Sequence, residues 1–377
     1  MLLLLRGRRA MGTVRQVLGS SFVDIELSME ERELALPPLH SVFQTVNSHL
    51  LVETIKDLGK FTYRAVPISD STEGLARGEE AYQVAITLPS AQAALGRIVD
   101  VMGRPVDDKG PLPLSETVDF NSPPPLPSFF CPMEQLITGI KAIDLLCPLV
   151  VGGKNGLVGF PGKTTLMRHL IDTLQYDLGV YCAIASRTGE IRDFVELGLD
   201  KVAMVNCGMG EPVGARARAL QTAARMAHNT TTKVALFVDD LSRWEEAVDE
   251  MQAAKSTIPQ FQEAFLSNGK ITSIQCLSRN TKELVGALDS TVILSLDRAN
   301  RGLFPAVDPF QSQSSLMDAT FLGERHVEIA NAVVAMLHRE RELLDFAKTT
   351  GMVEDFTDEA KLALLASTII CQRKTCI

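Results

Sequence analysis

The sequence of 377 residues lacks an excess of positive charge, is poor in aromatic side chains and has no long hydrophobic run. Its net charge of -9 argues against a general nucleic-acid binder, because such proteins usually carry a basic surface. Aromatic residues make up 6% of the chain, so platforms that stack nucleic-acid bases are not expected. No apolar run reaches the roughly 18 residues of a transmembrane helix. We therefore expect neither nucleic acid as a partner nor a transmembrane segment.

Cysteine pairs of the C-x-x-C type are also absent. The seven cysteines are scattered and odd in number, and four of them lie inside apolar runs. These four are Cys147, Cys182, Cys207 and Cys276. Free cysteine is among the residues most often found buried, so we expect reduced thiols in the core and a reducing compartment.

The composition that remains is that of an ordinary globular protein, with 46% apolar and 22% charged residues and room for two or three domains. The N-terminus carries no acidic residue before Asp24 but has four arginines, Arg6, Arg8, Arg9 and Arg15. This pattern fits either a remnant of an organellar targeting segment or a frayed basic terminus. The two interpretations stay open at this point.

The first part of the chain, from residue 11 to about residue 86, has the pattern of β-strands. VRQVLGSSFVDIEL and FTYRAVPI are rich in β-branched residues that partly alternate with polar ones, and Gly, Pro and Asp separate such runs. A small antiparallel barrel or sandwich fits this pattern. The proline-rich stretch NSPPPLPSFFCP then predicts a linker, because proline breaks both helices and central strands.

The middle of the chain alternates short apolar runs with helical patterns. The runs are GLVGF, VYCAIAS, KVAMVNC, VALFVDD, ITSIQCL and STVILSL. Each is apolar without clean alternation, as expected of strands covered on both faces, so we expect a doubly wound parallel sheet. Just before them, ITGIKAIDLL has helical spacing that places Ile137, Ile140, Ile143 and Leu146 on one face. Near the C-terminus, two helices broken at residues 349–351 predict a small helical domain.

One stretch, GLVGFPGKTTLMRHL from Gly156 to Leu170, ends like a phosphate-binding loop. Gly162, Lys163 and Thr164 precede a helix with Leu166, Leu170 and Leu174 on one face, but only two residues separate Gly159 from Gly162. A working G-x-x-x-x-G-K-[ST] loop needs four residues there, so this loop is two residues short. Pro161 removes a further N–H donor. The stretch predicts either a weak phosphate site at a helix start or a plain turn with an exposed lysine.

The run VALFVDD ends in two aspartates directly after an apolar strand. In nucleotide-binding α/β folds this position can hold Mg²⁺ through water, which makes Asp239 a candidate metal ligand with Asp240 beside it. The simpler interpretation is an aspartate that caps the following turn.

Taken together, several motifs resemble those of the β subunit of the rotary F-type ATP synthase, over residues 11 to about 366. The motifs are LGRIVDVMGRPVDDKGP, ITGIKAIDLLCP, SRTGEIRDF, LFVDDLSR and GLFPAVDP, the last of which favours the β type over the α type and over flagellar or secretion ATPases. The resemblance implies an N-terminal β-barrel, a central doubly wound P-loop NTPase (RecA-like) domain and a small C-terminal helical domain. The implied boundaries are 1–10 for a basic terminus with a possible targeting remnant, 11–88, 89–325 and 326–377.

The resemblance also implies roles for individual residues. Lys163 matches the phosphate-binding lysine, Thr164 the Mg²⁺-binding hydroxyl and Asp239 the Mg²⁺ carboxylate. Further matches are Arg187, Glu190 and Arg243 as catalytic residues, and Gly159, Gly162, Thr165 and Phe304 as nucleotide-binding residues, with Phe304 at the position of the adenine-stacking tyrosine. Mg²⁺ and ATP or ADP are the implied cofactors.

The sequence departs from the family where the chemistry is most demanding. Ser186 stands in place of the glutamate that polarises the attacking water, and a hydroxyl is no base near neutral pH. The stretch 245–265 reads mostly as helix where the family has a glycine- and proline-rich segment facing the shaft, and the acidic lever segment survives only as VEDFTDE. We therefore expect weak or absent turnover of ATP. The alternative is a non-catalytic homologue that acts as a nucleotide-binding or structural subunit.

The resemblance finally implies partners and a location. The family forms a hexamer of α-type and β-type subunits around a central shaft and makes ATP from ADP and phosphate, coupled to proton transport. The chain would then be a peripheral subunit of a membrane complex on the matrix side of the mitochondrial inner membrane, with the cytoplasm as the alternative.

Overall fold

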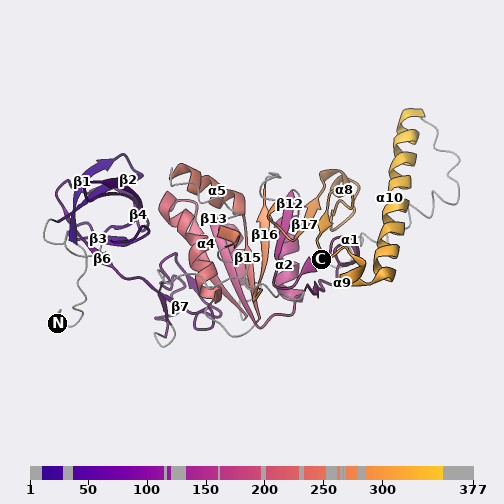
Figure 1. Ribbon diagram of the computed structural model, residues 1–377, viewed down its shortest axis with the longest axis horizontal. Coiled ribbons are helices and arrows are strands. Elements are labelled where there is room, and N and C mark those ends of the chain that lie inside the picture. Colours follow the sequence, from indigo (N-terminus) through magenta and orange to yellow (C-terminus); the bar gives the residue numbers. More distant parts are fainter. Residues whose placement is uncertain are drawn as a thin grey trace. The chain divides into compact units, whose positions relative to one another are not determined.

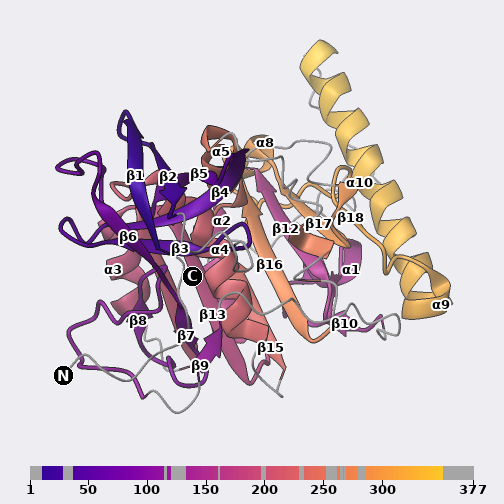
Figure 2. The same ribbon diagram turned by 60° about the vertical axis from the view of Figure 1, so that its left-hand side comes forward.

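The computed structural model describes most of the chain in two compact units (Figure 1; Figure 2). It describes residues 11–28, 37–113, 117–119, 133–159, 162–196, 201–228, 233–251, 261–263, 266, 269–278 and 286–350. The first unit comprises Met1–Leu126 with Asp177–Phe265, and the second comprises Pro127–Tyr176 with Leu266–Ile377. The basic terminus, the proline-rich linker, Pro161, VEDFTDE and the last predicted helix lie outside the described residues.

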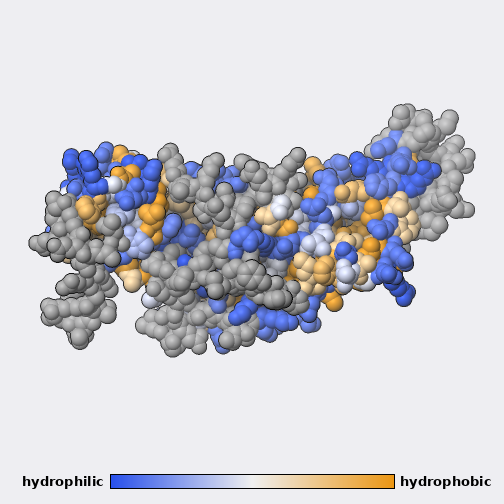
Figure 3. All heavy atoms as spheres, in the orientation of Figure 1, coloured by the Kyte–Doolittle hydropathy of each residue, from blue (hydrophilic) through white to orange (hydrophobic). Residues whose placement is uncertain are grey.

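No helix among the described residues is both long enough and apolar enough to cross a lipid bilayer. On the face shown in Figure 3, hydrophilic and hydrophobic residues are interspersed over the described part of the surface.

The first unit begins with a closed antiparallel barrel of six strands in the order β1-β2-β5-β4-β3-β6. The strands are β1 (Met11–Leu18), β2 (Phe22–Leu27), β3 (Val42–Thr45), β4 (Leu51–Gly59), β5 (Thr62–Pro67) and β6 (Glu80–Val84). The predicted N-terminal barrel is thereby confirmed.

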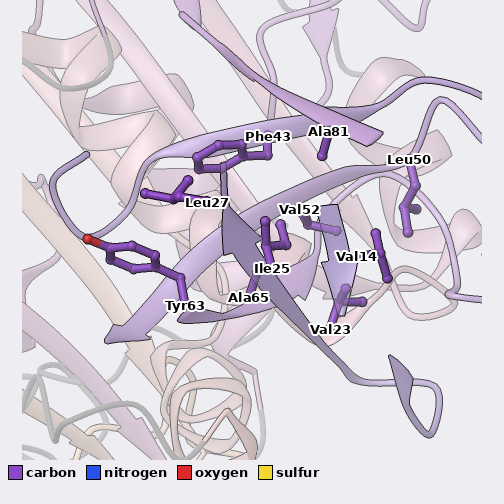
Figure 4. Packing of buried hydrophobic residues seen from close by; sticks show 10 residues of the cluster. All are labelled: Val14, Val23, Ile25, Leu27, Phe43, Leu50, Val52, Tyr63, Ala65 and Ala81. Atoms are coloured by element: carbon purple, nitrogen blue, oxygen red, sulfur yellow. The ribbon is translucent and has the colours of Figure 1, made fainter. Parts of the chain in front are cut away.

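Alternating apolar residues of these strands fill the interior of the barrel. Figure 4 shows ten of them, Val14, Val23, Ile25, Leu27, Phe43, Leu50, Val52, Tyr63, Ala65 and Ala81, all of which are buried. Full burial of one large apolar side chain contributes about 1.5–3 kcal/mol, so this core explains why the short strands close into a barrel.

The rest of the first unit contains a sheet of parallel strands in the order β15-β13-β14-β8. These are β15 (Val234–Val238), β13 (Leu178–Ser186), β14 (Val202–Gly208) and β8 (Ile98–Val99), with helices α3 (Thr188–Glu196), α4 (Val213–His228) and α5 (Leu241–Glu250). All nine residues of β13 are buried, as predicted for a strand covered on both faces. A small antiparallel pair, β7 (Thr87–Pro89) with β9 (Thr117–Asp119), completes this unit among the described residues.

The second unit contains a sheet of four strands, in the order β18-β17-β12-β16. β12 (Lys154–Gly159) pairs in parallel with β16 (Ile271–Leu277) and β17 (Ser290–Leu294), and Figure 2 shows these three side by side. β18 (Gln313–Ser314) adds an antiparallel edge. Also described are β10 (Gln135–Leu136), β11 (Leu149–Val150), α1 (Lys141–Leu146), α2 (Lys163–Thr173), α8 (Leu296–Asn300), α9 (Ala319–Leu322) and α10 (Glu324–Thr350). The predicted mostly parallel sheet and C-terminal helical part are confirmed.

The helix predicted within ITGIKAIDLL is shorter than expected. α1 begins only at Lys141, and the side chain of Ile137 is 73% exposed, whereas Ile143 is fully buried. The carboxylate of Asp144 accepts hydrogen bonds from the backbone N–H groups of Thr138 and Gly139, which holds the preceding residues in a loop. The expectation that Ile137 shares a buried helix face with the other apolar residues is therefore wrong.

The four cysteines expected in the core, Cys147, Cys182, Cys207 and Cys276, are all buried free thiols. Burial raises the pKa of Cys147 to about 12 and that of Cys182 well above its usual value. These thiols stay protonated near neutral pH, which is why they act as small apolar residues of the core.

Candidate nucleotide-binding site

The start of α2 carries the predicted phosphate-binding residues in the second unit. Gly162 caps the helix in the left-handed conformation, with φ at 97°, and no side chain bonds to the cap. The first turn holds no acidic residue, so no carboxylate of that turn competes with a bound anion for the backbone N–H groups. The helix start therefore has the electrostatics of an anion site.

The face of α2 behind this site anchors it to the core. Leu166, Leu170 and Leu174 are all buried, as their spacing predicted. At the other side of the short turn, Gly159 ends β12 with φ at 98°, and a Cβ atom there would lie 2.6 Å from the carbonyl oxygen of Leu294. Only glycine fits at this point, because any side chain would collide with β17.

Lys163 is the first residue of α2 and is buried, with 8% of its surface exposed. Its Nζ donates a hydrogen bond to Oγ of Ser278, at a distance of 2.8 Å. Thr164 is half-buried and Thr165 is exposed. The interpretation of Lys163 as an exposed residue of a plain turn is therefore wrong, because Ser278 and the surrounding core hold it in place.

Ser278 was not among the predicted site residues. It follows β16 directly, and the carboxyl ends of parallel strands are where ligands bind in such sheets. Its position after the apolar run ITSIQCL was the signal that could have identified it.

Phe304, expected to stack on a base, lies half-buried in the loop after α8. Contacts to α10 hold this loop on both sides. Arg301 forms an ion pair with Glu340, and the ring of Phe310 lies 4.2 Å from that of His338 between ring centroids. The position of the aromatic ring is thus tied to the long C-terminal helix within the second unit.

In the first unit, the predicted carboxylate Asp239 follows β15 and meets Ser186 at the end of β13. Oγ of Ser186 donates a hydrogen bond to Oδ2 of Asp239, at 3.1 Å, and the serine is 4% exposed. The backbone N–H of Asp239 donates to the carbonyl oxygen of Cys182. Both residues are therefore fixed by the parallel pairing of β13 with β15.

Arg243 reaches the same corner from α5. Its Nη1 donates to the carbonyl oxygens of Ile184 and Ala185, at 3.2 and 2.9 Å, and lies 3.9 Å from Oδ2 of Asp239. Ala185 has a left-handed backbone, with φ at 48°, where the register of β13 against β14 shifts. The guanidinium thus supports an unusual bend at the end of β13, which directs Ser186 to Asp239.

The environment of Asp239 raises the pKa of its carboxyl above the usual value. Burial is the largest cause, and the nearby carboxylates of Glu190 and Asp240 add to it, whereas Arg243 and the Ser186 hydroxyl act in the opposite direction. A cation close to Asp239 would favour its ionised form. Within the described ranges, no group of three or more His, Cys, Asp or Glu side chains could hold a metal by itself.

Arg187 and Glu190 lie at the start of α3. The backbone N–H of Arg187 donates to Oε2 of Glu190, at 3.2 Å, which is the reciprocal part of a capping box. The side chain of Arg187 is exposed and Glu190 is half-buried.

Asp240 has a similar structural function, because its carboxylate accepts a hydrogen bond from the backbone N–H of Ser242 and caps α5. The sequence left open that an aspartate at the end of VALFVDD caps the following turn, and Asp240 does so.

Several of the predicted residues, with Ser278 in addition, therefore lie in two groups, one in each unit. The second unit brings together Gly162, Lys163, Thr164 and Ser278 at the start of α2 and the end of β16. The first unit brings together Ser186, Asp239 and Arg243, with Glu190 close enough to affect the pKa of Asp239.

Comparison with known proteins gives one family match and a similar solved structure. Residues 139–268 match the model of the ATP synthase alpha/beta family, nucleotide-binding domain. The chain is also similar to the assembled ATPase EscN from the type III secretion system of enteropathogenic E. coli, with a TM-score of 0.82 and 20% identity over 97% of this chain and 96% of that one. The matched segment contains every predicted site residue except Phe304. Residues 139–268 are thus similar to the nucleotide-binding domain of the ATP synthase alpha/beta family, and the chain shares its fold with the secretion ATPase.

Proposed function

We propose that this chain is a nucleotide-binding subunit similar to the β subunit of rotary ATP synthases, with weak or absent turnover of ATP. The proposal combines the matched nucleotide-binding domain with the side chains at the two groups of site residues. Relatives of the β type make or hydrolyse ATP in a rotary complex coupled to proton transport, as the sequence resemblance implies.

Ser186 is the observation that carries the proposal of impaired turnover. The resemblance assigns this position to the glutamate that polarises the attacking water. Ser186 is buried and its hydroxyl already donates to Asp239, so it offers no carboxylate and no free base at this point. Loss of a general base typically slows a reaction by about 10²–10⁴-fold.

The phosphate side keeps more of its function. The start of α2, where no side chain bonds to the cap, and the buried Lys163 suit the outer phosphate groups of ATP or ADP, and we assign Gly159, Gly162 and Thr165 to the same nucleotide. Phe304 offers a ring face for the base. Only two residues separate Gly159 from Gly162, so the turn supplies fewer N–H donors than a complete phosphate loop.

The resemblance implies Mg²⁺ as a cofactor, with one proposed ligand in each unit. Hydroxyl and carboxylate oxygens are preferred Mg²⁺ ligands, and Thr164 and Asp239 are the residues we assign to it. The raised pKa of Asp239 supports this assignment, because a neighbouring cation would offset the unfavourable burial of its negative charge. Bound Mg²⁺ would neutralise part of the negative charge of the phosphate groups.

Two polar contacts favour the alternative of a non-catalytic homologue with a structural or interaction function. Arg243 donates to two main-chain carbonyls of β13, and Glu190 caps α3. Both side chains therefore have structural functions that would preserve them without catalysis. We retain Arg187, Glu190 and Arg243 as catalytic residues only within the first proposal.

The partners and the domain boundaries are part of the same proposal. By resemblance, the chain associates with α-type subunits and a central shaft in a hexamer, peripheral to a membrane complex at the matrix side of the mitochondrial inner membrane or, alternatively, in the cytoplasm. The proposed segments are 1–10, 11–88, 89–325 and 326–377. The described part of the barrel ends with β6 at Val84, which supports a boundary near residue 88.

Turnover of ATP by the full-length chain tests the proposal. We expect hydrolysis in the presence of Mg²⁺ to stay below about 1 s⁻¹, the low end of ordinary enzymes, while ATP and ADP still bind. Phosphate release would be measured with purified protein, and nucleotide binding by calorimetry. Faster turnover would show that Ser186 and the short loop do not impair catalysis, and absence of binding would favour the structural alternative.

A further inference from the structure

The junction between the barrel and α4 lies within the first unit and has a compact apolar core. Ile55 of β4 and Val66 of β5 pack in one buried cluster with Ala217 of α4 and with Ala247 and Met251 at α5. Trp244 of α5 is also buried, and its indole N–H donates to the carbonyl oxygen of Ala217. The barrel is therefore held to the helices of its unit by close packing.

A buried ion pair crosses this junction. Nη1 of Arg218, on α4, donates to Oε2 of Glu53, on β4, at 2.7 Å. Their side chains are only 1% and 7% exposed. Burial of two charges is unfavourable unless their remaining polar atoms are also well satisfied, so the other oxygen of Glu53 is important.

His40 provides that contact from the turn before β3. Its Nδ1 lies 2.9 Å from Oε1 of Glu53, and its side chain is 51% exposed. The carboxylate of Glu53 thus has one oxygen directed to a buried arginine and the other to a histidine that solvent can reach. We call Arg218, Glu53 and His40 the junction triad.

The charged groups around the triad are few and come from each element packed against it. The hydrogen bond to Glu53 is the largest influence on His40 and raises its pKa, whereas burial and the cations Arg218 and Arg225 of α4 lower it, and the net direction is upward. For Glu53 the largest influence is burial, yet Arg218 and His40 bring its pKa below the usual value. Asp100, after β8, also faces Arg218, and burial raises its pKa.

We propose that His40 is a pH-sensitive latch of the barrel–α4 junction. When protonated, it forms a charge-assisted hydrogen bond to Glu53 and completes a cation–carboxylate–cation arrangement that strengthens the attachment of the barrel to α4. When neutral, it leaves Glu53 with Arg218 as its single cationic partner in the triad. The junction is then weaker, although the apolar packing remains.

The sign of the effect follows from linkage. The pKa of His40 is higher in the folded protein than its ordinary value of 6.5, so folding favours the protonated ring. This contribution to stability is fully present below the ordinary value and is lost as the pH rises through the raised one. Arg218 stays charged throughout, and the lowered pKa of Glu53 keeps that carboxylate ionised, so His40 is the member of the triad that titrates near neutral pH.

A matched pair of histidine variants of the full chain tests the latch. His40 and His49 both lie in the barrel with a left-handed backbone, at φ of 70° and 53°, and asparagine tolerates that conformation better than most residues. We would compare the wild type, His40→Asn and His49→Asn by thermal unfolding between about pH 5.5 and 8.5, the range in which histidine changes its charge. His49 is exposed and does not contact Glu53 in any described bond, so its variant is the control.

The latch predicts that His40→Asn lowers the melting temperature at the acidic end by about 2–4 °C. The difference from the wild type should shrink toward zero as the pH rises. His49→Asn should follow the wild type at every pH. A His40→Asn difference that is equal at all pH values, or absent, would overturn the latch.

Hydrogen exchange locates the effect. At pH 6, the amides of α4 and β4 should exchange faster in His40→Asn than in the wild type, and at pH 8 the two proteins should exchange at the same rate. Equal protection at both pH values, or a difference confined to other elements, would contradict a latch at this junction.

Discussion

The start of α2 and the corner between β13 and β15 carry the two groups of predicted site residues, and they differ in what their chemistry depends on. At α2, anion binding depends on backbone N–H groups and on one lysine, all set by the helix itself. At the other corner, activation of water would depend on a single carboxylate side chain, and Ser186 occupies that position with its hydroxyl bonded to Asp239. Under the proposed function, binding that depends on the backbone is therefore less sensitive to substitution than catalysis that depends on one side chain.

The two groups also differ in the charges of the residues around Lys163 and around Asp239. Lys163 is bonded to a neutral hydroxyl, that of Ser278, and no acidic residue lies in the first turn of α2. Asp239 instead lies beside Arg243 and close to two further carboxylates, in a place where burial raises its pKa. The two groups thus differ in the described neighbours of their charged residue: a hydroxyl for Lys163, and both a guanidinium and carboxylates for Asp239.

The largest expected effect comes from Lys163→Ala on nucleotide binding. A charge-assisted hydrogen bond contributes about 1.5–3 kcal/mol, so we expect the dissociation constant for ATP or ADP to rise by about 10- to 100-fold. Calorimetry with the full chain would measure it.

Lys141→Ala is the matched control for that experiment, because Lys141 also opens a helix, α1, but is exposed. Its variant should bind nucleotide like the wild type. Unchanged binding by Lys163→Ala would place the nucleotide away from the start of α2 and would remove the contrast drawn above.

Asp239→Asn should have opposite effects on stability and on Mg²⁺. Because burial raises the pKa of Asp239, its ionised form is unfavourable in the folded protein at neutral pH, and a neutral amide relieves this. We expect a melting temperature about 2 °C higher, together with about tenfold weaker dependence of nucleotide binding on Mg²⁺. The same pKa shift predicts that Mg²⁺-dependent binding by the wild type weakens as the pH falls, because a protonated carboxyl is a poor ligand.

Asp249→Asn serves as the control, since Asp249 is an exposed aspartate near the C-terminal end of α5. It should leave both the melting temperature and the Mg²⁺ dependence close to those of the wild type. If Asp239→Asn were less stable than the wild type, or bound Mg-nucleotide normally, the assignment of Asp239 to the metal would be wrong.

The smallest effect is expected from Ser186→Glu, measured as ATP turnover. The turn before α2 stays two residues short, and the new carboxylate would enter a site that is 4% exposed and already faces Asp239. We expect a gain of less than about tenfold, well below the 10²–10⁴ that a general base contributes in an intact site. Ser186→Gln, of the same size but neutral, separates the effect of charge from that of volume; a gain of a hundredfold with glutamate alone would show that the short loop is tolerated.

Much of the central sheet could be predicted from short-range patterns. Runs such as VYCAIAS and ITSIQCL became β13 and β16 because an uninterrupted apolar run is stable as a strand only where both faces are covered. The helix after Gly162 was also predictable, because its leucines recur every four residues. The prediction failed at Ile137, where the carboxylate of Asp144 holds the residues before α1 in a loop.

The candidate site was predictable in its residue types but not in its contacts. Spacing and resemblance pointed to Lys163, Asp239 and Arg243, but the partner of Lys163 is Ser278, which lies 115 residues away in the chain. Likewise, the bonds from Arg243 to β13 depend on the bend at Ala185, which no local pattern of the sequence announces.

By itself, the sequence determined the order of the strands and helices, the glycine-framed start of α2 and a hydroxyl instead of a carboxylate at position 186, because these depend on residue identity and on neighbours within a few positions. The tertiary structure alone decided which polar groups meet: Ser186 with Asp239, Lys163 with Ser278, and Arg218 with Glu53, 165 residues away. Such pairs form only where strand pairing and helix packing bring distant residues within hydrogen-bonding distance, and it is these contacts that determine the charge and reactivity of each group.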